Sequence, residues 1–302
     1  MTVNHLVTGS NPVSGATAFF IYLNQNLTTS IPFNSNFLII FITLNKKGIK
    51  MKLKIIIGTI LLLLGSIVNA GVHGSWGYSG DANPVHWGDI KPEFFMCKEG
   101  KNQSPINIDN TNIVLANGLQ KLEFSYTTGA KDALNNGHTI KVDVAKGSYI
   151  KIDGIKFELK QFHFHSPSEN QINGVNFPLE AHFVHQSKDG QLAVVAVMYK
   201  EGKQNTTLKK ICKTIFTDIH KVHPCKLTAE DIKKLLPKNK DYYRFSGSLT
   251  TPPCSEGVRW IVLKEYLEIG KAQVDKFVNV MMKGHNNRPV QPLNARKVLK
   301  NK

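Results

Sequence analysis

The sequence predicts a β-dominated α+β fold in which one large sheet carries short peripheral helices. Two observations support this prediction. Most of the chain after residue 70 divides into short runs that are typical of strands and are separated by glycine or polar turns. Helical spacing of apolar residues occurs in only three short segments. The 302 residues, 41% of them hydrophobic and 20% charged, have the composition of an ordinary globular protein.

The expected strands are concentrated between residues 139 and 199. Gly147 and Gly154 fall in the turns between the first three strands, and Lys188-Asp189-Gly190 is a turn sequence that predicts a hairpin. We expect strands at Thr139–Ala145, Tyr149–Ile152, Ile155–His165, Pro178–Gln186, Leu192–Tyr199 and Val258–Leu263.

The three helical segments lie outside this run of strands. Thr228 is a suitable N-cap for the second of them, and the third spans Ala272–Met282. The apolar positions are Leu208, Ile211, Cys212 and Ile215 in the first segment, Ile232, Leu235 and Leu236 in the second, and Val274, Phe277, Val278 and Met281 in the third.

The first 70 residues differ from the rest of the chain. They contain no Asp, Glu or Arg, and Met51 precedes a short lysine-containing stretch and the apolar run Ile55–Val68. Small residues follow up to Ala70, which is the pattern of a secretory signal peptide. We expect a signal peptide at 51–70 and a single periplasmic or secreted domain at 71–302, without stable membrane insertion. An uncleaved anchor is the alternative. Residues 1–50 are expected to be an untranslated or disordered extension.

The chain is basic and contains four cysteines. Its net charge is +16, and residues 71–302 keep 33 basic and 22 acidic side chains, a net +11. This lysine-rich charge indicates a solvated face, with attraction to an anionic membrane surface as the weaker alternative. We expect no nucleic-acid partner, because the basic residues do not alternate with aromatic ones. Cys97, Cys212, Cys225 and Cys254 include no C-x-x-C pair, and three pairings are open.

Gln161-Phe162-His163-Phe164-His165 is the first stretch that points to chemistry. Because alternate side chains of a strand share a face, His163 and His165 point together, while Phe162 and Phe164 point toward a core. Two histidines at this spacing are as readily polar positions of a half-buried strand as they are metal ligands.

The stretch Leu179–His185 supplies a third histidine. By the same alternation Glu180, His182 and Val184 share one face, and His185 lies on the other. A metal-bound imidazole usually donates its second N–H to a carboxylate or carbonyl, and Glu180 is available to His182. His185 is therefore expected to be a core histidine. Three neutral imidazoles leave a tetrahedral zinc ion one open position, which is the catalytic pattern.

Six stretches of the chain resemble the alpha carbonic anhydrases, in that family's order and at its approximate spacing. They are Gln103–Ile108, Asn135–His138, Gln161–His165, Glu180–His185, Ser248–Pro253 and Asn286–Leu293. Trp76-Gly-Tyr-Ser-Gly80 matches as well, so the resemblance covers about Trp76 to Arg296. It implies one large twisted, mostly antiparallel sheet with short peripheral helices, of the type found in bacterial secreted or periplasmic members.

The resemblance implies a zinc site that hydrates carbon dioxide. The ligands would be His163, His165 and His182, supported by Gln161, by the backbone carbonyl of Asn286 and by Glu180. Thr250 would accept a hydrogen bond from zinc-bound hydroxide and donate one to Glu169, because an ionised carboxylate only accepts. Without the resemblance, Thr250 and Glu169 would be ordinary polar loop residues.

The resemblance also implies a proton shuttle, an apolar pocket and a disulfide. His138 matches the shuttle, and Tyr78 and Asn136 match residues that order its water chain, although a histidine without a role is the default for a surface position. Thr251 would lie beside bicarbonate. The pocket positions are Val184, Val194, Leu249, Val258 and Trp260. Cys97 and Cys254 match the disulfide of secreted members, and Cys212 and Cys225 then either pair or remain reduced.

The expected function is therefore reversible hydration of carbon dioxide to bicarbonate and a proton, with Zn²⁺ as cofactor and these small molecules as partners. A homodimer is compatible with the family. The alternatives are a non-catalytic relative, a zinc hydrolase of small esters and a metal-buffering protein. The first would have lost a ligand histidine. The last would need neither the Thr250–Glu169 pair nor an apolar pocket.

Overall fold

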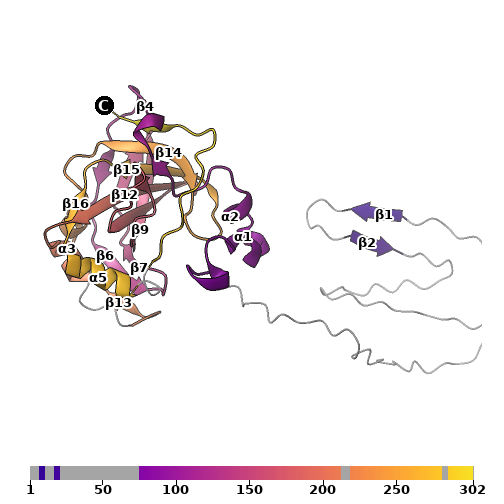
Figure 1. Cartoon of the computed structure of the whole chain (residues 1–302), viewed down its shortest axis with the longest axis horizontal. Coiled ribbons are helices and arrows are strands. Elements are labelled where there is room, and N and C mark those ends of the chain that lie inside the picture. The colour runs from indigo at the N-terminus through magenta and orange to yellow at the C-terminus, as the bar shows by residue number, and fades with distance from the viewer. Residues whose placement is uncertain (1–6, 11–16, 21–74, 212–217, 281–284, 302) are drawn as a thin grey trace, which may run out of the picture. The chain divides into compact units, whose positions relative to one another are not determined.

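The computed structural model describes residues 7–10, 17–20, 75–211, 218–280 and 285–301 (Figure 1). The chain divides into two units, Met1–Gly65 and Ser66–Lys302. In the first unit, β1 (Val7–Ser10) and β2 (Thr17–Phe20) pair antiparallel. No helix within the described ranges is long and apolar enough to cross a membrane.

The second unit contains a sheet of 13 described strands. They are β4 (Ile113–Leu115), β5 (Glu123–Ser125), β6 (Ala130–Asn135), β7 (Ile140–Val144), β8 (Tyr149–Ile152), β9 (Ile155–His165), β11 (Leu179–Ser187), β12 (Leu192–Glu201), β13 (Val222–Pro224), β14 (Tyr242–Ser248), β15 (Glu256–Leu263), β16 (Leu267–Ile269) and β17 (Val298–Lys300). A separate parallel pair consists of β3 (Asn107–Ile108) and β10 (Gln171–Ile172).

The main path of the sheet has the order β13-β6-β7-β9-β11-β12-β15-β14-β17-β4. Within this sheet β12 runs parallel to β15 and β16, and β17 runs parallel to β4. The other described strand pairs of this sheet are antiparallel. The prediction of a mostly antiparallel sheet is confirmed. The expected strands correspond to β7, β8, β9, β11, β12 and β15, and no end differs by more than two residues. The predicted hairpin joins β11 to β12, with Gly190 at a φ of 82° that favours glycine.

The helices are short, as expected. They are α1 (Trp87–Ile90), α2 (Met96–Glu99), α3 (Thr206–Ile211), α4 (Ala229–Lys233) and α5 (Lys271–Val280), with 3-10 turns at Gly80–Ala82, Pro92–Phe94 and Asn110–Asn112. Thr228 caps α4, because its hydroxyl accepts a hydrogen bond from the backbone N–H of Asp231 at 3.2 Å. Three predicted helix positions, Cys212, Ile215 and Met281, lie outside the described residues.

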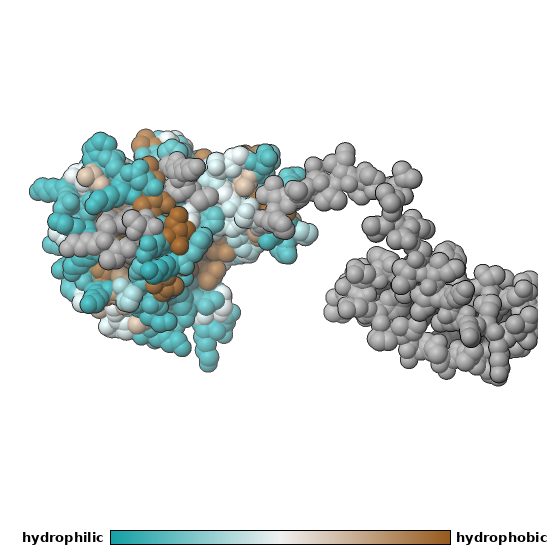
Figure 2. Space-filling view, turned by 90° about the horizontal axis from the view of Figure 1, so that it is seen from below, coloured by the Kyte–Doolittle hydropathy of each residue, from teal (hydrophilic) through white to brown (hydrophobic). Residues whose placement is uncertain are grey.

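The two faces of the sheet bury different apolar clusters. On one face Phe162, Phe164 and Phe183 pack with residues of α3, α4 and α5, and the rings of Phe164 and Phe277 are 5.0 Å apart. On the other face Trp260 belongs to a smaller cluster drawn mainly from β12, β14 and β15. The described surface visible in Figure 2 is mostly hydrophilic, with hydrophobic residues in small patches. The smaller cluster adjoins the histidines.

Candidate metal centre and active site

Three histidines meet on one face of the sheet where β9 pairs with β11. In the antiparallel register His182 lies opposite His163, and Glu180 lies opposite His165. Because alternate side chains of β9 share a face, this register brings all three imidazoles together. One nitrogen from each ring lies within 4.8 Å of the other two. The structure therefore brings together the predicted ligands.

Each imidazole is oriented by an acceptor on its far nitrogen. Nδ1 of His163 is hydrogen-bonded to Oε1 of Gln161 (2.9 Å), and Nδ1 of His165 to the carbonyl of Asn286 (2.7 Å). Oε1 of Glu180 lies 3.0 Å from Nε2 of His182 in an ion-pair contact. In a neutral imidazole the far nitrogen then carries the proton and the near nitrogen presents its lone pair. The three supports expected from the sequence all contact their histidines.

The electrostatics of the cluster suit a bound cation. Burial, together with the charge of His182, lowers the pKa of His163 and of His165 well below the usual value. Burial acts in the same direction on His182, but attraction to Glu180 and Glu169 outweighs it and raises the pKa. Nε2 of His165 is buried and has no hydrogen-bond partner in the described part of the chain. A buried nitrogen that lacks a partner fits a metal ligand.

The carboxyl group of Glu169 is fully buried beside the histidines. Its Oε2 lies 3.4 Å from Nε2 of His165 and 3.8 Å from Nδ1 of His182. Its Oε1 accepts a hydrogen bond from the backbone N–H of Arg288 at 2.9 Å. Burial raises the pKa of Glu169 to about 7, against the lowering effects of His182, the Arg288 N–H and the Thr250 hydroxyl. Thr250 therefore lies within reach of this carboxyl group.

Glu180 also fixes the loop that carries Glu169. Its Oε2 accepts hydrogen bonds from the backbone N–H groups of Glu169 and Asn170, at 2.7 Å and 2.9 Å. Its Oε1 accepts a third from Nδ2 of Asn170 at 2.8 Å. One buried carboxylate thus orients both His182 and the backbone of Glu169.

Comparisons with known proteins connect this geometry to a family. Residues 82–302 match the family model described as eukaryotic-type carbonic anhydrase. The carbonic anhydrase of Neisseria gonorrhoeae is 47% identical over 245 residues, which cover 80% of this chain and 94% of that protein. The chain belongs to the carbonic anhydrase family. The carbonic anhydrase of Pectobacterium atrosepticum is 43% identical over 243 residues, which cover 80% of this chain and 98% of that protein.

A solved structure identifies the class within the family. The alpha-carbonic anhydrase of Thermovibrio ammonificans, in complex with the inhibitor sulfanilamide, is 53% identical and has a TM-score of 0.72. The match covers 75% of this chain and 99% of that chain. These similarities confirm the predicted alpha class, the predicted fold and the prediction that the chain is a carbonic anhydrase enzyme.

An apolar wall adjoins the histidines of the enzyme. The register places Val184 of β11 opposite Val194 of β12, and Val194 opposite Trp260 of β15. The indole of Trp260 packs edge-on against His182, with ring centroids 4.9 Å apart. The predicted pocket positions that share this cluster are Val184, Val194, Leu249, Val258 and Trp260. The structure thus brings all five apolar positions to the face of the sheet that carries the histidines.

His138 lies in the turn between β6 and β7. Oδ1 of Asn136 accepts hydrogen bonds from the backbone N–H groups of His138 and Thr139, at 2.9 Å and 2.7 Å. The imidazole stacks on Trp76, with centroids 3.9 Å apart and planes 11° apart, and Tyr78 lies edge-on to it at 6.4 Å. The structure therefore brings Tyr78 and His138 together. The Asn136 oxygen stabilises the turn.

Asn286 connects the His138 turn to the ligand strand. Its Nδ2 donates hydrogen bonds to the carbonyls of His138 and Phe164, each at 2.9 Å. Its Oδ1 accepts one from the backbone N–H of Ser166 at 2.7 Å, and its carbonyl binds His165. The side chain therefore does more than the backbone role expected from the sequence.

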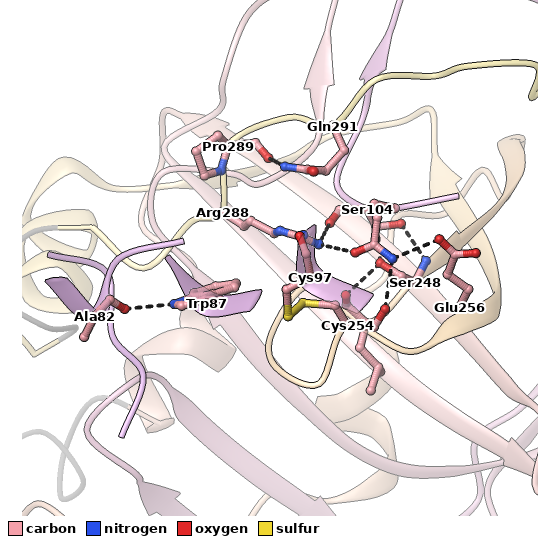
Figure 3. The surroundings of a disulfide bond; sticks show 12 residues. Ala82, Trp87, Cys97, Ser104, Ser248, Cys254, Glu256, Arg288, Pro289 and Gln291 are labelled. Carbon is pink, nitrogen blue, oxygen red and sulfur yellow. Dashed lines mark hydrogen bonds between the residues drawn. A yellow bond between two sulfur atoms is a disulfide. The ribbon is translucent and has the colours of Figure 1, made fainter. Parts of the chain in front are cut away.

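The disulfide expected from the resemblance joins Cys97 of α2 to Cys254, with Cα atoms 5.0 Å apart and a separation of 157 positions in the sequence (Figure 3). It ties the N-terminal helices to the loop that carries Thr250. A cross-link of this span stabilises the fold by about 5 kcal/mol on a chain-entropy account. Cys225 is half-buried, and its suggested partner, Cys212, lies outside the described residues.

Sequence reasoning missed the part that Arg288 plays. Its guanidinium group is buried and donates hydrogen bonds to Oε1 of Gln103, to the carbonyl of Ser104 and to the carbonyl of Cys97, at 2.8, 2.8 and 2.9 Å (Figure 3). Its backbone N–H binds Glu169. The residue lies in the last of the family-like stretches, but only three-dimensional contacts reveal its role.

Proposed function

We propose that the enzyme hydrates carbon dioxide reversibly to bicarbonate and a proton, with Zn²⁺ bound by His163, His165 and His182. The observation that carries the proposal is the convergence of three oriented imidazole nitrogens beside the buried Glu169–Thr250 pair. Neutral imidazoles suit zinc, and three of them leave one position open. When bound, zinc would acidify water and so supply a hydroxide nucleophile near neutral pH.

Thr250 and Glu169 would orient this nucleophile. An ionised Glu169 only accepts hydrogen bonds, so the Thr250 O–H points toward it. The lone pairs of the Thr250 oxygen are then free to accept a hydrogen bond from the nucleophile, which turns the attacking lone pair toward the substrate. The backbone N–H of Arg288 favours the ionised form of Glu169.

The apolar wall suits a substrate that has no charge and little polarity. Carbon dioxide needs a pocket that excludes competing water rather than one that supplies hydrogen bonds. Val184, Val194 and Trp260 offer such a surface next to His182. Thr251, the half-buried neighbour of Thr250, is proposed to lie beside the product bicarbonate.

Each turnover releases a proton that must leave the site. His138 would accept this proton through a short chain of waters, because an imidazole titrates near neutral pH. The Tyr78 hydroxyl and the Asn136 NH₂ group are proposed to order these waters. Stacking of His138 on Trp76 keeps the ring at the end of that path.

Stopped-flow measurement of carbon dioxide hydration tests this function. The full chain is assayed before and after metal removal with dipicolinate, and again after addition of Zn²⁺. We expect activity to disappear with the metal and to return with zinc. Hydration that persists without detectable metal would refute the proposal. Hydrolysis of 4-nitrophenyl acetate by the same preparation is expected to be far slower than hydration, and the reverse order would favour an esterase.

We also propose that residues 51–70 are removed as a secretory signal and that residues 71–302 act as one periplasmic or secreted domain. The Cys97–Cys254 disulfide supports this proposal, because disulfides persist in oxidising compartments. N-terminal sequencing of the secreted or periplasmic protein should begin at Gly71. A mature protein that begins upstream of Met51 would contradict the cleaved signal peptide and an untranslated extension, and would favour a translated one.

A further inference from the structure

His220 lies against the turn that carries His138. Its backbone N–H donates a hydrogen bond to the carbonyl of Asn135 at 2.7 Å, and Ile219 pairs with Asn135 in an isolated parallel bridge. A Cβ placed on Gly137 would lie 3.6 Å from Cε1 and 3.7 Å from Nε2 of His220. The imidazole therefore lies beside the residue that immediately precedes His138, on the side where a Cβ atom would project.

The backbone on each side of His220 restricts where this residue can lie. Its φ of 63° lies in the left-handed region, which is unfavourable for a residue with a Cβ atom. β13 begins two residues later, and Val222 pairs with Leu134 of β6. The His220 side chain nevertheless remains exposed to solvent.

His138 itself has restricted access to solvent. Trp76 covers one face of its ring, and its Nδ1 is buried without a hydrogen-bond partner within the described ranges. A proton on this ring needs an acceptor that is open to bulk water. His220 is an exposed imidazole beside the same turn.

We propose that His220 is a second proton-relay residue, which takes the proton from His138 and releases it to buffer outside the cleft. The inference rests on the proposed function of His138. In each transfer an imidazolium gives the proton on one nitrogen to a water or imidazole lone pair and returns to the neutral form. Only N–H and O–H bonds change. His220 touches neither the substrate nor the metal, so it acts through His138.

The surroundings of the His138 ring favour loss of its proton. Burial, and in addition the charge of His220, lowers the pKa of His138, so the inner ring retains a proton weakly. The turn itself carries no titratable side chain besides His138. Asp218 is the acidic group nearest in sequence to His220, and its carboxylate lies 3.3 Å from Nε2 of His223 and 3.5 Å from Nζ of Lys221. This carboxylate is therefore paired with Lys221 and lies against the His223 ring rather than against His220.

The test compares His220→Gln with a matched control, His223→Gln, in the full zinc-loaded chain. His223 belongs to the same segment but contacts Asp218 rather than the Gly137 turn. In weak buffer we expect His220→Gln to lower kcat roughly threefold or more. Its kcat/KM should not change, because that parameter reports steps before proton release. Added imidazole should restore kcat, and His223→Gln should match the unmodified chain.

A series relay makes one more prediction. In the His138→Ala background, His220→Gln should cause little further loss of kcat, because the inner step is already broken. Unchanged kcat in His220→Gln, an equal fall in kcat and kcat/KM, or additive losses in the double variant would each overturn the relay. An unmodified chain that fails to hydrate carbon dioxide would instead overturn the proposed function, and the inference with it.

Discussion

His182 and His185 lie on the same strand, β11, but their environments are opposite. Nε2 of His182 lies 3.0 Å from Oε1 of Glu180, and although burial lowers its pKa, attraction to Glu180 and Glu169 raises it overall. Nε2 of His185 lies 2.8 Å from the hydroxyl of Tyr126, and burial lowers its pKa to about 3. One histidine faces the metal centre, and the other faces the aromatic core.

The difference shows that position in the strand, rather than residue type, assigns the role. An odd separation along a strand puts two side chains on opposite faces. The face that carries His182 also presents a buried carboxylate, which a metal-bound imidazole needs as its acceptor. The face that carries His185 presents aromatic rings, including Tyr126 at 6.0 Å between centroids. The prediction that His185 is a core histidine is confirmed by this burial.

Removal of a proposed metal-ligating histidine should have the largest effect. His182→Ala deletes one of the three converging nitrogens, so we expect loss of bound zinc and of detectable carbon dioxide hydration. His185→Gln is the control on the same strand and should keep both. Atomic absorption and stopped-flow hydration measure the two properties. Hydration at the unmodified rate in His182→Ala would remove His182 from the metal site.

Phe183 and Val184, which are neighbours on β11 and face opposite sides of the sheet, should contribute differently to stability. Phe183 packs in the core against Phe162, with centroids 5.3 Å apart, so Phe183→Ala should lower the free energy of unfolding by about 3–5 kcal/mol. Val184 is half-buried on the face that carries the histidines, so Val184→Ala should lower the free energy of unfolding by about 1 kcal/mol. Urea unfolding at pH 7 measures both. A greater loss for Val184→Ala than for Phe183→Ala would contradict the assignment of the two faces.

The Thr250 hydroxyl should contribute more to catalysis than to the stability of the fold. Thr250→Ala removes the group that would orient the nucleophile, so we expect kcat/KM to fall about 100-fold. Thr250→Ser retains the hydroxyl and should keep most of the activity. Stopped-flow hydration with zinc-loaded proteins provides the measurement. Equal activity in the alanine and serine variants would show that the hydroxyl has no part in the reaction.

A smaller effect than the loss of a ligand or of the Phe183 ring is expected on stability at acid pH. Between about pH 6.5 and pH 3 the unfolded chain protonates His185 while the folded chain does not. Stability therefore falls as the pH is lowered through this window, by about 2 kcal/mol between pH 7 and pH 5 for this residue. His185→Gln should remove that part of the pH dependence in urea unfolding. An unchanged dependence would show that His185 titrates normally in the folded chain.

The parts of the site that depend on one strand could be predicted from the sequence. Strand alternation pairs His163 with His165 and separates His182 from His185, and the neighbouring Glu180 then favours His182. The contact of Glu169 with Arg288 joins residues 119 positions apart, and no local period encodes such a contact. For the same reason the sequence does not reveal that His220 lies beside the turn that contains Gly137. Short strands such as β4 and β17, at one end of the sheet, are not predicted from the sequence because three residues contain too little pattern.

Asn286 links the three-histidine cluster to the turn that carries His138. Its amide and carbonyl groups bind the His138 turn, Phe164, His165 and Ser166 at the same time. A displacement of this residue would therefore shift His165 and His138 together rather than change the gap between them. If the proposed zinc site and proton shuttle are correct, one substitution at position 286 should disturb zinc affinity and proton transfer at once.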